Sequence, residues 1–258
     1  MADTPLITAC IVSYNSEKHI ANVLSSLVGS TIAQRMKVIV IDNASTDQTA
    51  AIVKENFPDV HLVQLPQNIG FGKGHNQAIS YMDAPYHLIV NPDITIEKDV
   101  LEKMVAFMDT HRDVVLLTPK VKHPDGSEQF LPKEQPSVHY LLSGYLERLG
   151  GPFTAWRSKY TWREKGIKVP TELSFATGCF MLARADAFKA VGGFDQRYFL
   201  YMEDADLTAE MKIRGLTLYH PDFCVTHVWA RENVHHLRGT LRHVKAILQY
   251  FLKWGWRL

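Results

Sequence analysis

Three carboxylates, those of Glu203, Asp204 and Asp206, lie within four residues of the chain. Because like charges at this spacing repel one another, the proton affinity of at least one of them should be raised. A carboxylate of raised proton affinity can take a proton from an attacking hydroxyl group, so the cluster is a candidate for general-base catalysis. The alternative is that the acids only cap the N-terminus of a helix, where negative charge is stabilised.

Two other acidic residues follow runs of apolar residues. Asp42 comes directly after the run 38–41, and Asp93 comes three residues after the run 87–90. Either could be a turn residue, because Asp forms Asx turns and caps helices at such places. Ligands also bind at strand ends in parallel sheets, so both carboxylates are candidate ligand contacts.

A glycine-rich segment, 68–76, could let backbone N–H groups approach a phosphate. It differs from a Walker loop, because Gly74 follows Lys73 where Ser or Thr is required. No G-x-G-x-x-G pattern follows the first apolar run, where a dinucleotide-binding fold would need it. Tyr14 follows that run and offers a flat ring on which a base can stack.

The elements that must position these residues alternate in the first half of the chain. Apolar runs predict strands over 6–12, 38–41, 60–65 and 87–90, and helical spacing covers 17–28, 46–57 and 74–82. This alternation predicts an α/β fold in which helices cover both faces of a parallel sheet. Right-handed crossovers then place the carboxyl ends of the strands at one edge, so the candidate residues should meet there.

The second half is less regular. Helices are predicted over 101–108, 184–191, 205–213 and 235–252, and strands over 114–117, 175–183, 216–220 and 224–228. The stretch 120–170 is rich in Pro, Lys and Trp and has no clean period, so we expect only loops and short elements there. No internal repeat or linker divides the sequence, and we expect a single domain.

Composition is that of an ordinary globular protein. Of 258 residues, 46% are hydrophobic and 21% are charged, and 28 basic residues offset 27 acidic ones to a net charge of +1. This balance gives no support for nucleic-acid binding. Three distant cysteines without a CxxC pair predict reduced thiols. Since neither a signal peptide nor a membrane-spanning run is recognised, we expect a cytoplasmic protein.

Six short motifs occur in the order found in the inverting family 2 glycosyltransferases, and the chain resembles this family. The resemblance implies a GT-A fold, with a Rossmann-like mixed sheet flanked by helices. Within the family, the chain looks most like bacterial L-rhamnosyltransferases of O-antigen and other cell-surface polysaccharide. The likeness covers about residues 7–76, 87–108 and 175–254. Its motifs are Val12-Ser13-Tyr14-Asn15, Asp42-Asn43-Ala44-Ser45-Thr46-Asp47, Asn68-Ile69-Gly70-Phe71-Gly72, Asn91-Pro92-Asp93, Gly192-Gly193-Phe194-Asp195 and Tyr201-Met202-Glu203-Asp204-Ala205-Asp206-Leu207.

The resemblance implies a nucleotide site at the strand ends. Ser13 and Tyr14 would hold the base, and Asp42 would bond the edge of the base. The glycine-rich loop would complete the nucleotide pocket through Asn68, Gly70 and Gly74.

The resemblance also implies a divalent cation, Mg²⁺ or Mn²⁺, that bridges the diphosphate of the donor. Asp93 would be the last acid of the family's DXD motif, and His227 matches a histidine that completes the metal shell in some relatives. This chain departs from the motif, because Asn91 replaces its first acid. An amide binds a hard cation less strongly than a carboxylate, so we expect a weak site that forms with the nucleotide. A metal-independent enzyme is the alternative.

Asp204 stands where the family has its catalytic base. The implied reaction is a single displacement that inverts the sugar carbon and moves L-rhamnose from dTDP-L-rhamnose to a lipid-linked oligosaccharide or polysaccharide. Glu203 and Asp206 remain alternatives for the base. Two other classes also stay open, a nucleotidyltransferase and a non-catalytic nucleotide-sugar-binding protein.

Apolar and basic residues recur at helical spacing near the end of the sequence, namely Leu237, Arg238, Leu241, Arg242, Val244, Lys245, Leu248, Phe251, Lys253 and Arg257. The pattern is typical of a basic amphipathic helix on an anionic membrane, or of a helix packed on the domain with a solvated basic face. The resemblance favours the membrane, at the inner face of the plasma membrane. We therefore expect a nucleotide-binding half (1–93), an acceptor-binding and catalytic half (94–232) and a C-terminal helix (233–258).

Overall fold

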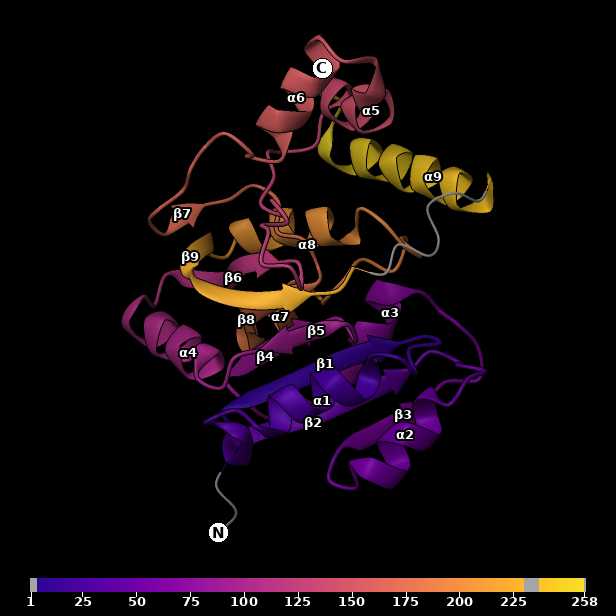
Figure 1. The fold of residues 1–258 in the computed structure, drawn as a ribbon, viewed down its shortest axis with the longest axis vertical. Helices are drawn as coiled ribbons and strands as arrows, with labels where there is room; N and C mark the ends of the chain where they lie inside the picture. Colours follow the sequence, from indigo (N-terminus) through magenta and orange to yellow (C-terminus); the bar gives the residue numbers. More distant parts are fainter. Residues whose placement is uncertain (1–3, 230–236, 258) are drawn as a thin grey trace.

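The computed structural model describes residues 4–229 and 237–257, and a mixed sheet crosses its centre (Figure 1). The strands are β1 (Ile7–Ser13), β2 (Met36–Asp42), β3 (His61–Gln64), β4 (Tyr86–Val90), β5 (Ile94–Ile96), β6 (Val114–Lys122), β7 (Thr171–Glu172), β8 (Phe180–Arg184) and β9 (Leu216–His227). Their order is β3-β2-β1-β4-β8-β6-β9-β5, and β7 pairs with β9.

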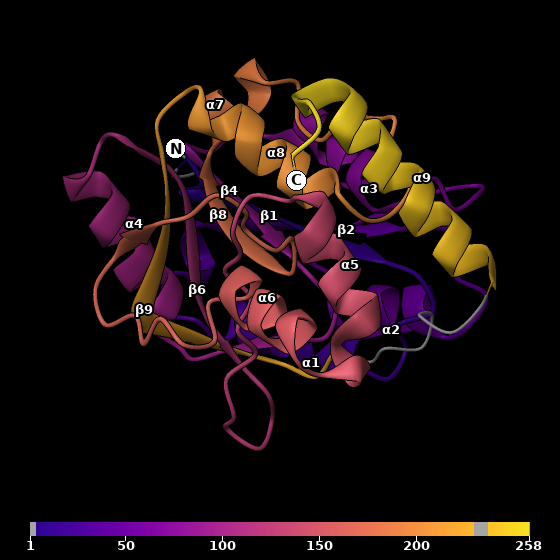
Figure 2. The same cartoon turned by 90° about the horizontal axis from the view of Figure 1, so that it is seen from above.

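Helices cover both faces of this sheet (Figures 1 and 2). They are α1 (Ile20–Val28), α2 (Thr49–Asn56), α3 (Phe71–Asn76), α4 (Val100–Thr110), α5 (Val138–Leu146), α6 (Pro152–Tyr160), α7 (Ala185–Ala190), α8 (Glu203–Lys212) and α9 (Leu237–Trp254). Short 3-10 turns η1 (Ala33–Arg35), η2 (Gln77–Tyr81) and η3 (Glu147–Leu149) complete the set.

The first half confirms the predicted alternation. β1 runs parallel to β2 and to β4, and β2 runs parallel to β3. All seven residues of β1 are buried. Ile11 packs in the core on one face of the sheet, and Cys10 packs in the core on the other. Ser13 at the end of β1 is level with Asp42 at the end of β2, so the polar strand ends lie along one edge as expected.

Two predicted short strands, 216–220 and 224–228, are in fact the single strand β9. It runs parallel to β6, and the register shifts where Pro119 pairs with His220 and Lys120 pairs with Cys224. The residues of β9 between these two pairs have no partner in β6 and form a bulge. Pro221 lies in this interval, and a proline there interrupts the apolar pattern without ending the strand.

The strand predicted over 175–183 is wrong in its first part, because β8 begins only at Phe180. Before that residue, backbone N–H groups bond to side chains of α8 instead of a neighbouring strand. Ala176 N donates to Thr208 Oγ1 at 3.1 Å, and Gly178 N donates to Asp204 Oδ2 at 3.1 Å. The backbone N–H groups of Ala176 and Gly178 are therefore bonded to α8 and not to a neighbouring strand.

The region 120–170 contains two helices, α5 and α6, that its irregular pattern did not predict. Residues of both pack in a third core with α9, in which Tyr160, Tyr250 and Phe251 are buried. Tyr145 of α5 and His243 of α9 share a hydrogen bond of 2.6 Å. α5, α6 and α9 together form what we call the helical layer, at the end of the molecule farthest from β2 (Figures 1 and 2).

The C-terminal helix exists, and its described part packs on the domain. Lys253 lies 2.8 Å from Asp206 Oδ1, 2.8 Å from Glu210 Oε1 and 3.1 Å from Asp195 Oδ2. Its charge is therefore used inside the protein, which corrects its prediction as part of a solvated basic face. The predicted helix start at residue 235 lies outside the described residues.

Candidate active site

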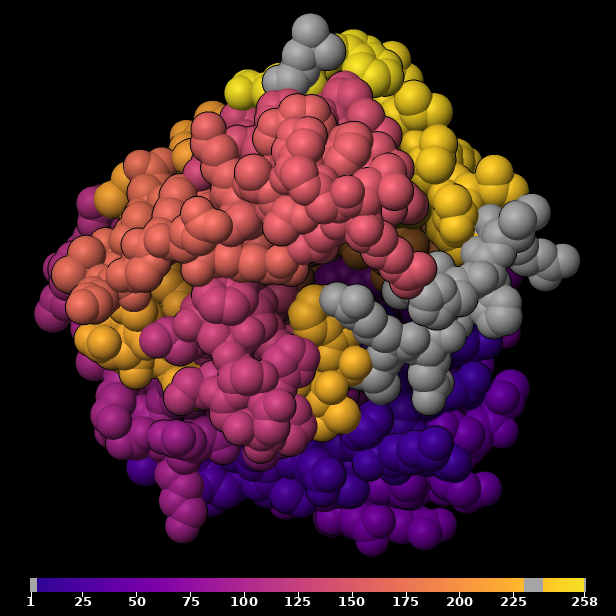
Figure 3. Space-filling model, turned by 45° about the horizontal axis from the view of Figure 1, so that its top comes forward, coloured from indigo at the N-terminus to yellow at the C-terminus, as the bar shows by residue number. Residues whose placement is uncertain are grey.

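A cleft of about 1320 Å³ opens at the carboxyl edge of the sheet. Figure 3 shows the surface hollowed below the helical layer, where the lower part of the molecule begins. Five of the predicted site residues line the cleft, namely Tyr14, Asn68, Gly70, Asn91 and Asp93. The other five, which are Ser13, Asp42, Gly74, Asp204 and His227, are not among its lining residues.

Ser13 and Asp42 lie just behind the wall of the cleft. Ser13 is fully buried, and its hydroxyl has no hydrogen-bond partner among the described residues. Asp42 is 1% exposed, and its Oδ1 accepts a hydrogen bond from Ser45 N at 3.3 Å. Tyr14 is 49% exposed and is the aromatic face that this strand end offers to the cleft.

Asn43 shapes the loop that follows β3, a role that sequence reasoning missed. Its Nδ2 donates to Gly70 O at 3.1 Å, and its Oδ1 accepts from Ile69 N at 2.8 Å. A side-chain amide has both a donor and an acceptor, so it can fix a backbone loop in this way. Its place directly after Asp42, in the strand-end motif, was the available signal.

Glycine is required at two positions of this loop. Gly70 has a φ of +90°, and a Cβ there would lie 2.2 Å from Phe199 O. At Gly74, a Cβ would lie 2.9 Å from a methyl group of Val12. Gly70 thus shapes the cleft wall, whereas Gly74 lets α3 pack closely on β1, so the structure places Gly74 in packing rather than at the cleft surface.

Asp93 and His227 meet at the end of β4. Asp93 Oδ1 lies 3.2 Å from His227 Nε2, and both side chains are largely buried. His227 is the last residue of β9, and Val228 N donates to Asp93 O at 3.1 Å, so the two strand ends are fixed side by side.

The chemistry of this pair fits a divalent cation. Neighbouring ligands of an octahedral cation with bonds of about 2.1 Å are about 3 Å apart, close to the observed spacing of the carboxylate and imidazole. Two protein ligands are few, and no cluster of three His, Cys, Asp or Glu side chains suits a metal among the residues described. The residues therefore fit a cation that takes its remaining ligands from a bound molecule or water.

Asp204 is held at the first turn of α8. Its Oδ2 accepts from Gly178 N at 3.1 Å, and its Oδ1 accepts from Ala205 N at 2.9 Å. Desolvation by the surrounding protein atoms raises the pKa of Asp204 above its ordinary value. The Lys133 ammonium and these N–H groups partly oppose the rise. A partly exposed carboxylate of raised pKa is suited to accept a proton.

Glu203 and Asp206 have other environments. Glu203 is 5% exposed, and burial together with the adjacent Asp204 raises its pKa to about 8. Asp206 is 1% exposed and accepts from Trp254 Nε1 at 2.7 Å besides pairing with Lys253. Asp206 therefore helps to hold α9 on the domain. Of the three carboxylates, only Asp204 is partly exposed to solvent as well as raised in pKa.

Two consecutive residues connect Asp204 to the strand end with Asn91. Gly178 N bonds Asp204, and Cys179 O accepts from Asn91 N at 2.9 Å. The general-base candidate and the strand end that carries Asn91 and Asp93 are thus neighbours across the 178–179 segment.

Three further functional candidates were not predicted as site residues, although one of them, Arg242, belongs to the predicted C-terminal helix. Lys133 Nζ lies 4.3 Å from the centroid of the Phe175 ring and influences Asp204 electrostatically. The Arg242 guanidinium lies 4.5 Å from the Phe199 ring and lines the cleft. The third, Gln129, bonds to His227.

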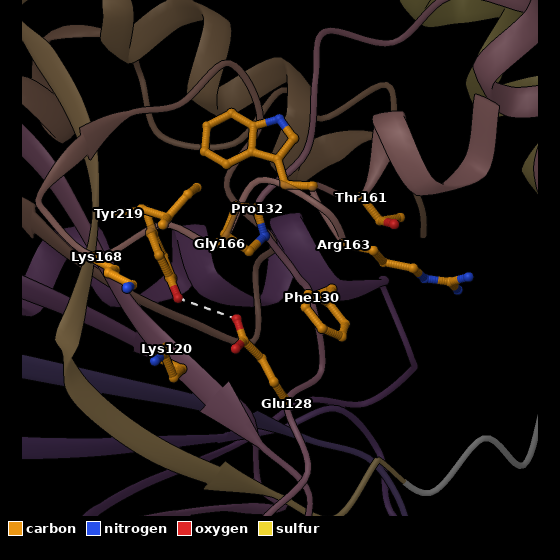
Figure 4. Close-up of a pocket in the computed structure, with 11 residues that line it drawn as sticks. Lys120, Glu128, Phe130, Pro132, Thr161, Arg163, Gly166, Lys168 and Tyr219 are labelled. Atoms are coloured by element: carbon orange, nitrogen blue, oxygen red, sulfur yellow. Dashed lines mark hydrogen bonds between the residues drawn. The ribbon is translucent and has the colours of Figure 1, made fainter. Parts of the chain in front are cut away.

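A second, smaller cavity of about 280 Å³ lies between residues 128–132 and 161–168 (Figure 4). Lys120, Lys168 and Arg163 border it, and Tyr219 donates to Glu128 Oε1 at 3.4 Å on one side. Trp162 also lines this cavity, is 6% exposed and donates to Glu134 Oε1 at 2.9 Å.

Comparison with known proteins gives matches along most of the chain. The profile described as Glycosyl transferase family 2 matches residues 8–192. N-acetylglucosaminyl-diphospho-decaprenol L-rhamnosyltransferase of Mycobacterium tuberculosis is 30% identical over 241 residues, which cover 87% of this chain and 76% of the relative. Rhamnosyltransferase WbbL of Escherichia coli is 26% identical over 273 residues, covering 96% of this chain and 93% of WbbL.

Solved structures agree in fold. The mannosyltransferase PcManGT from Pyrobaculum calidifontis, solved with GDP-Man and Mn²⁺, superposes with a TM-score of 0.64 at 16% identity. The match covers 97% of this chain and 64% of PcManGT.

Proposed function

The chain belongs to glycosyl transferase family 2 and is a glycosyltransferase of the GT-A fold, and from this premise we propose that it transfers L-rhamnose from dTDP-L-rhamnose. The acceptor is a hydroxyl group of a lipid-linked oligosaccharide or polysaccharide, and the product belongs to cell-surface polysaccharide. Two relatives named as rhamnosyltransferases support the sugar. Family membership also removes the nucleotidyltransferase alternative.

The observation that carries the mechanism is the placement of Asp204 beside the strand end that holds Asn91 and Asp93. Asp204 takes the proton of the acceptor hydroxyl while the hydroxyl oxygen forms a bond to the anomeric carbon. The bond from that carbon to the diphosphate oxygen breaks at the same time, and its electron pair leaves with the nucleoside diphosphate. Attack opposite the leaving group inverts the sugar carbon.

Asp93 and His227, with the amide oxygen of Asn91, would hold Mg²⁺ or Mn²⁺ together with the donor diphosphate. When bound, the cation neutralises charge that develops on the departing diphosphate. Because the cleft supplies few anionic ligands, the cation binds weakly until the nucleotide is present.

Tyr14 stacks on the base of the donor, and the loop that carries Asn68 and Gly70 closes the pocket around the nucleotide. Asp42, buried behind the cleft wall at the end of β2, would support the side of the pocket that meets the edge of the base, with Ser13 beside it. This division makes residues 1–93 the nucleotide-binding half and residues 94–232 the acceptor-binding and catalytic half.

The helical layer is the proposed contact with an anionic membrane. The helical layer, with the η3 turn between α5 and α6, exposes large apolar side chains, which are Leu142, Tyr145, Leu149, Leu241, Val244, Leu248 and Leu252. Lys245 in α9 and Arg257 after it are also exposed, and their charge complements anionic lipid. No helix in the described ranges is long and apolar enough to cross a bilayer.

Flotation with vesicles tests this contact. Leu248→Glu should abolish binding to phosphatidylglycerol vesicles, because it puts a charge into the apolar surface. Val169→Glu changes an even more exposed apolar residue outside the helical layer and should leave binding unchanged. Equal binding of both variants would remove the helical layer from the proposal.

Thermal unfolding with a panel of nucleotides tests the donor. Specific binding to the folded protein raises the midpoint by mass action. We expect dTDP to raise it more than UDP or GDP, and Mn²⁺ to add to the effect. A larger shift with UDP or GDP would overturn dTDP-L-rhamnose as donor while leaving the family intact.

Turnover completes the test. With dTDP-L-rhamnose, the protein should release dTDP slowly in water and faster with a lipid-linked acceptor. Binding of the nucleotide sugar without any release of dTDP would favour a non-catalytic binding protein.

A further inference from the structure

Residues 122–129 form a small hairpin after β6 that carries one side chain into the candidate active site. Lys122 and Glu128 form an antiparallel bridge, and His123 N donates to Ser127 O at 2.8 Å. The hairpin ends at Gln129, which is 4% exposed and reaches the last residue of β9.

The hydrogen bonds of Gln129 fix the orientation of its amide. Its nitrogen Nε2 lies 2.6 Å from His227 O and 3.5 Å from Lys122 O. Carbonyl oxygens only accept hydrogen bonds, so the donating end of the amide must be here. The amide oxygen Oε1 therefore faces His227 Nδ1, at 2.9 Å.

This orientation decides which ring nitrogen of His227 bears a proton. Since Gln129 Oε1 can only accept, His227 Nδ1 must donate and carries a hydrogen. In the neutral ring, the lone pair is then on Nε2, which points toward Asp93 Oδ1 at 3.2 Å. Two acceptors at this distance repel each other unless a positive charge lies between them.

Ring stacking supports the same orientation. The rings of His227 and Trp229 lie 5.9 Å apart with an interplanar angle of 12°, and those of His123 and Trp229 lie 6.1 Å apart at 11°. His123 Nδ1 also lies 3.0 Å from Gln129 Nε2. The hairpin thus holds both the plane and the hydrogen bond of the imidazole.

We infer that Gln129 is a positioning residue that presents His227 Nε2, beside Asp93, as a ligand for the divalent cation. The inference rests on the proposed function, because it requires that a cation binds there with the donor. Partners of metal-bound histidines commonly set the orientation of the ring, and their loss typically weakens metal binding about 10–100-fold. Gln129 lies in the region 120–170, for which the sequence predicted only loops and short elements.

Titration with Mn²⁺, followed by the electron paramagnetic resonance of the free ion, tests the inference in the presence of saturating dTDP. Gln129→Met keeps the length of the side chain and removes the amide, so Mn²⁺ should bind about 10–100-fold more weakly. The affinity for dTDP without metal should not change. A purely structural role of Gln129 would lower the unfolding midpoint and leave Mn²⁺ affinity intact.

Gln135→Met is the matched control. Gln135 lies in the same segment, but its side chain bonds to Tyr250 in the helical layer and not to His227. This variant should bind Mn²⁺ as the unaltered protein does. Equal Mn²⁺ affinity of Gln129→Met and the unaltered protein overturns the role of Gln129 alone. Failure of the unaltered protein to bind Mn²⁺ with dTDP overturns the proposed metal as well.

Nitrogen NMR of the unaltered protein tests the inference without any variant of Gln129. In the complex with Mg²⁺ and dTDP, the His227 ring should carry its proton on Nδ1, with His227→Gln used to assign the signals. A proton on Nε2 in that complex would overturn the inference.

Discussion

The two halves of the sheet differ in how far along the chain their contacts reach. In the first half, β1 pairs with β2 and β2 pairs with β3, the next strand along the chain in each case, and β1 also pairs with β4. In the second half, Gln129 bonds His227 98 residues later, and Lys253 bonds Asp206 47 residues earlier. The strands on the nucleotide side are thus mostly connected over short stretches of chain, whereas the surroundings of α8 and of His227 depend on distant segments.

The largest expected effect belongs to the distant contacts. Asp204→Asn should lower kcat by ~10²–10⁴-fold, because the acceptor hydroxyl loses its base. The affinity for dTDP should stay nearly unchanged, since the nucleotide side is built separately. Initial rates of dTDP release and equilibrium binding measure the two quantities.

Glu203→Gln is the control for this variant. Glu203 is buried next to Asp204 and its pKa is about 8, so it is mostly neutral near pH 7 and an amide resembles it. The control should keep the rate within a few-fold of the unaltered protein. A loss in Glu203→Gln as large as in Asp204→Asn would move the role of base to Glu203.

Lys253→Met should strongly destabilise the second half. Asp206, with 1% of its side chain exposed, would lose its cation inside the protein. Removing one partner of a buried ion pair typically costs about 3–5 kcal/mol. Urea unfolding should show this loss, while Lys245→Met, which changes an exposed lysine of the same helix, should stay within about 0.5 kcal/mol. Equal stability of the two variants would mean that α9 is not held by this network.

Gly70→Ala probes the junction between the halves. Gly70 has a φ of +90° and a ψ of 174°, and its Cβ would meet the Phe199 carbonyl. Backbone strain of this kind costs about 1–3 kcal/mol, and the clash adds to it. Gly126→Ala is the control, because its φ is +87° but nothing lies within 4 Å of its Cβ. Only Gly70→Ala should also weaken dTDP binding, and intact dTDP affinity would detach this loop from the nucleotide site.

The last expected effect accumulates gradually and is a pH dependence of stability. The folded protein holds the proton of Glu203 up to a pKa of about 8, whereas the unfolded chain releases it near 4.5. Between these values the folded state binds more protons, so stability falls as pH rises, by at most about 1.4 kcal/mol per pH unit. Glu203→Gln should flatten the curve of unfolding free energy between pH 5 and pH 8. An unchanged slope would show that Glu203 is not the group responsible.

The first half could be predicted from sequence because its signals are local. The apolar run before Asp42 and the helical spacing after it correspond directly to β2 and α2. Strand ends were located to within one or two residues, which was enough to bring Tyr14, Asn68, Asn91 and Asp93 to one cleft.

The second half could be predicted only in part, because there a residue's environment depends on segments far away. The apolar residues before Phe180 suggested a strand, but α8 takes their backbone N–H groups. The hydrogen bond between Gln129 and His227 does not produce a hydrophobic pattern in the sequence around either residue. Resemblance to a family identified Asp204 and His227 as candidates, but gave no sign of what orients them.

The distance in sequence between Asp206 and Lys253 has a consequence for synthesis of the protein. A ribosome that adds about 5–20 residues per second needs about 2–10 seconds to extend the chain from one to the other. During that interval α8 has been made, but the cation that neutralises Asp206 has not. The strands of the first half are already available for pairing, so the nucleotide side can form while the helix with Asp204 still waits for α9. The proposed base, Asp204, therefore lies on a helix whose ion pair with α9 forms only after the last part of the chain is made.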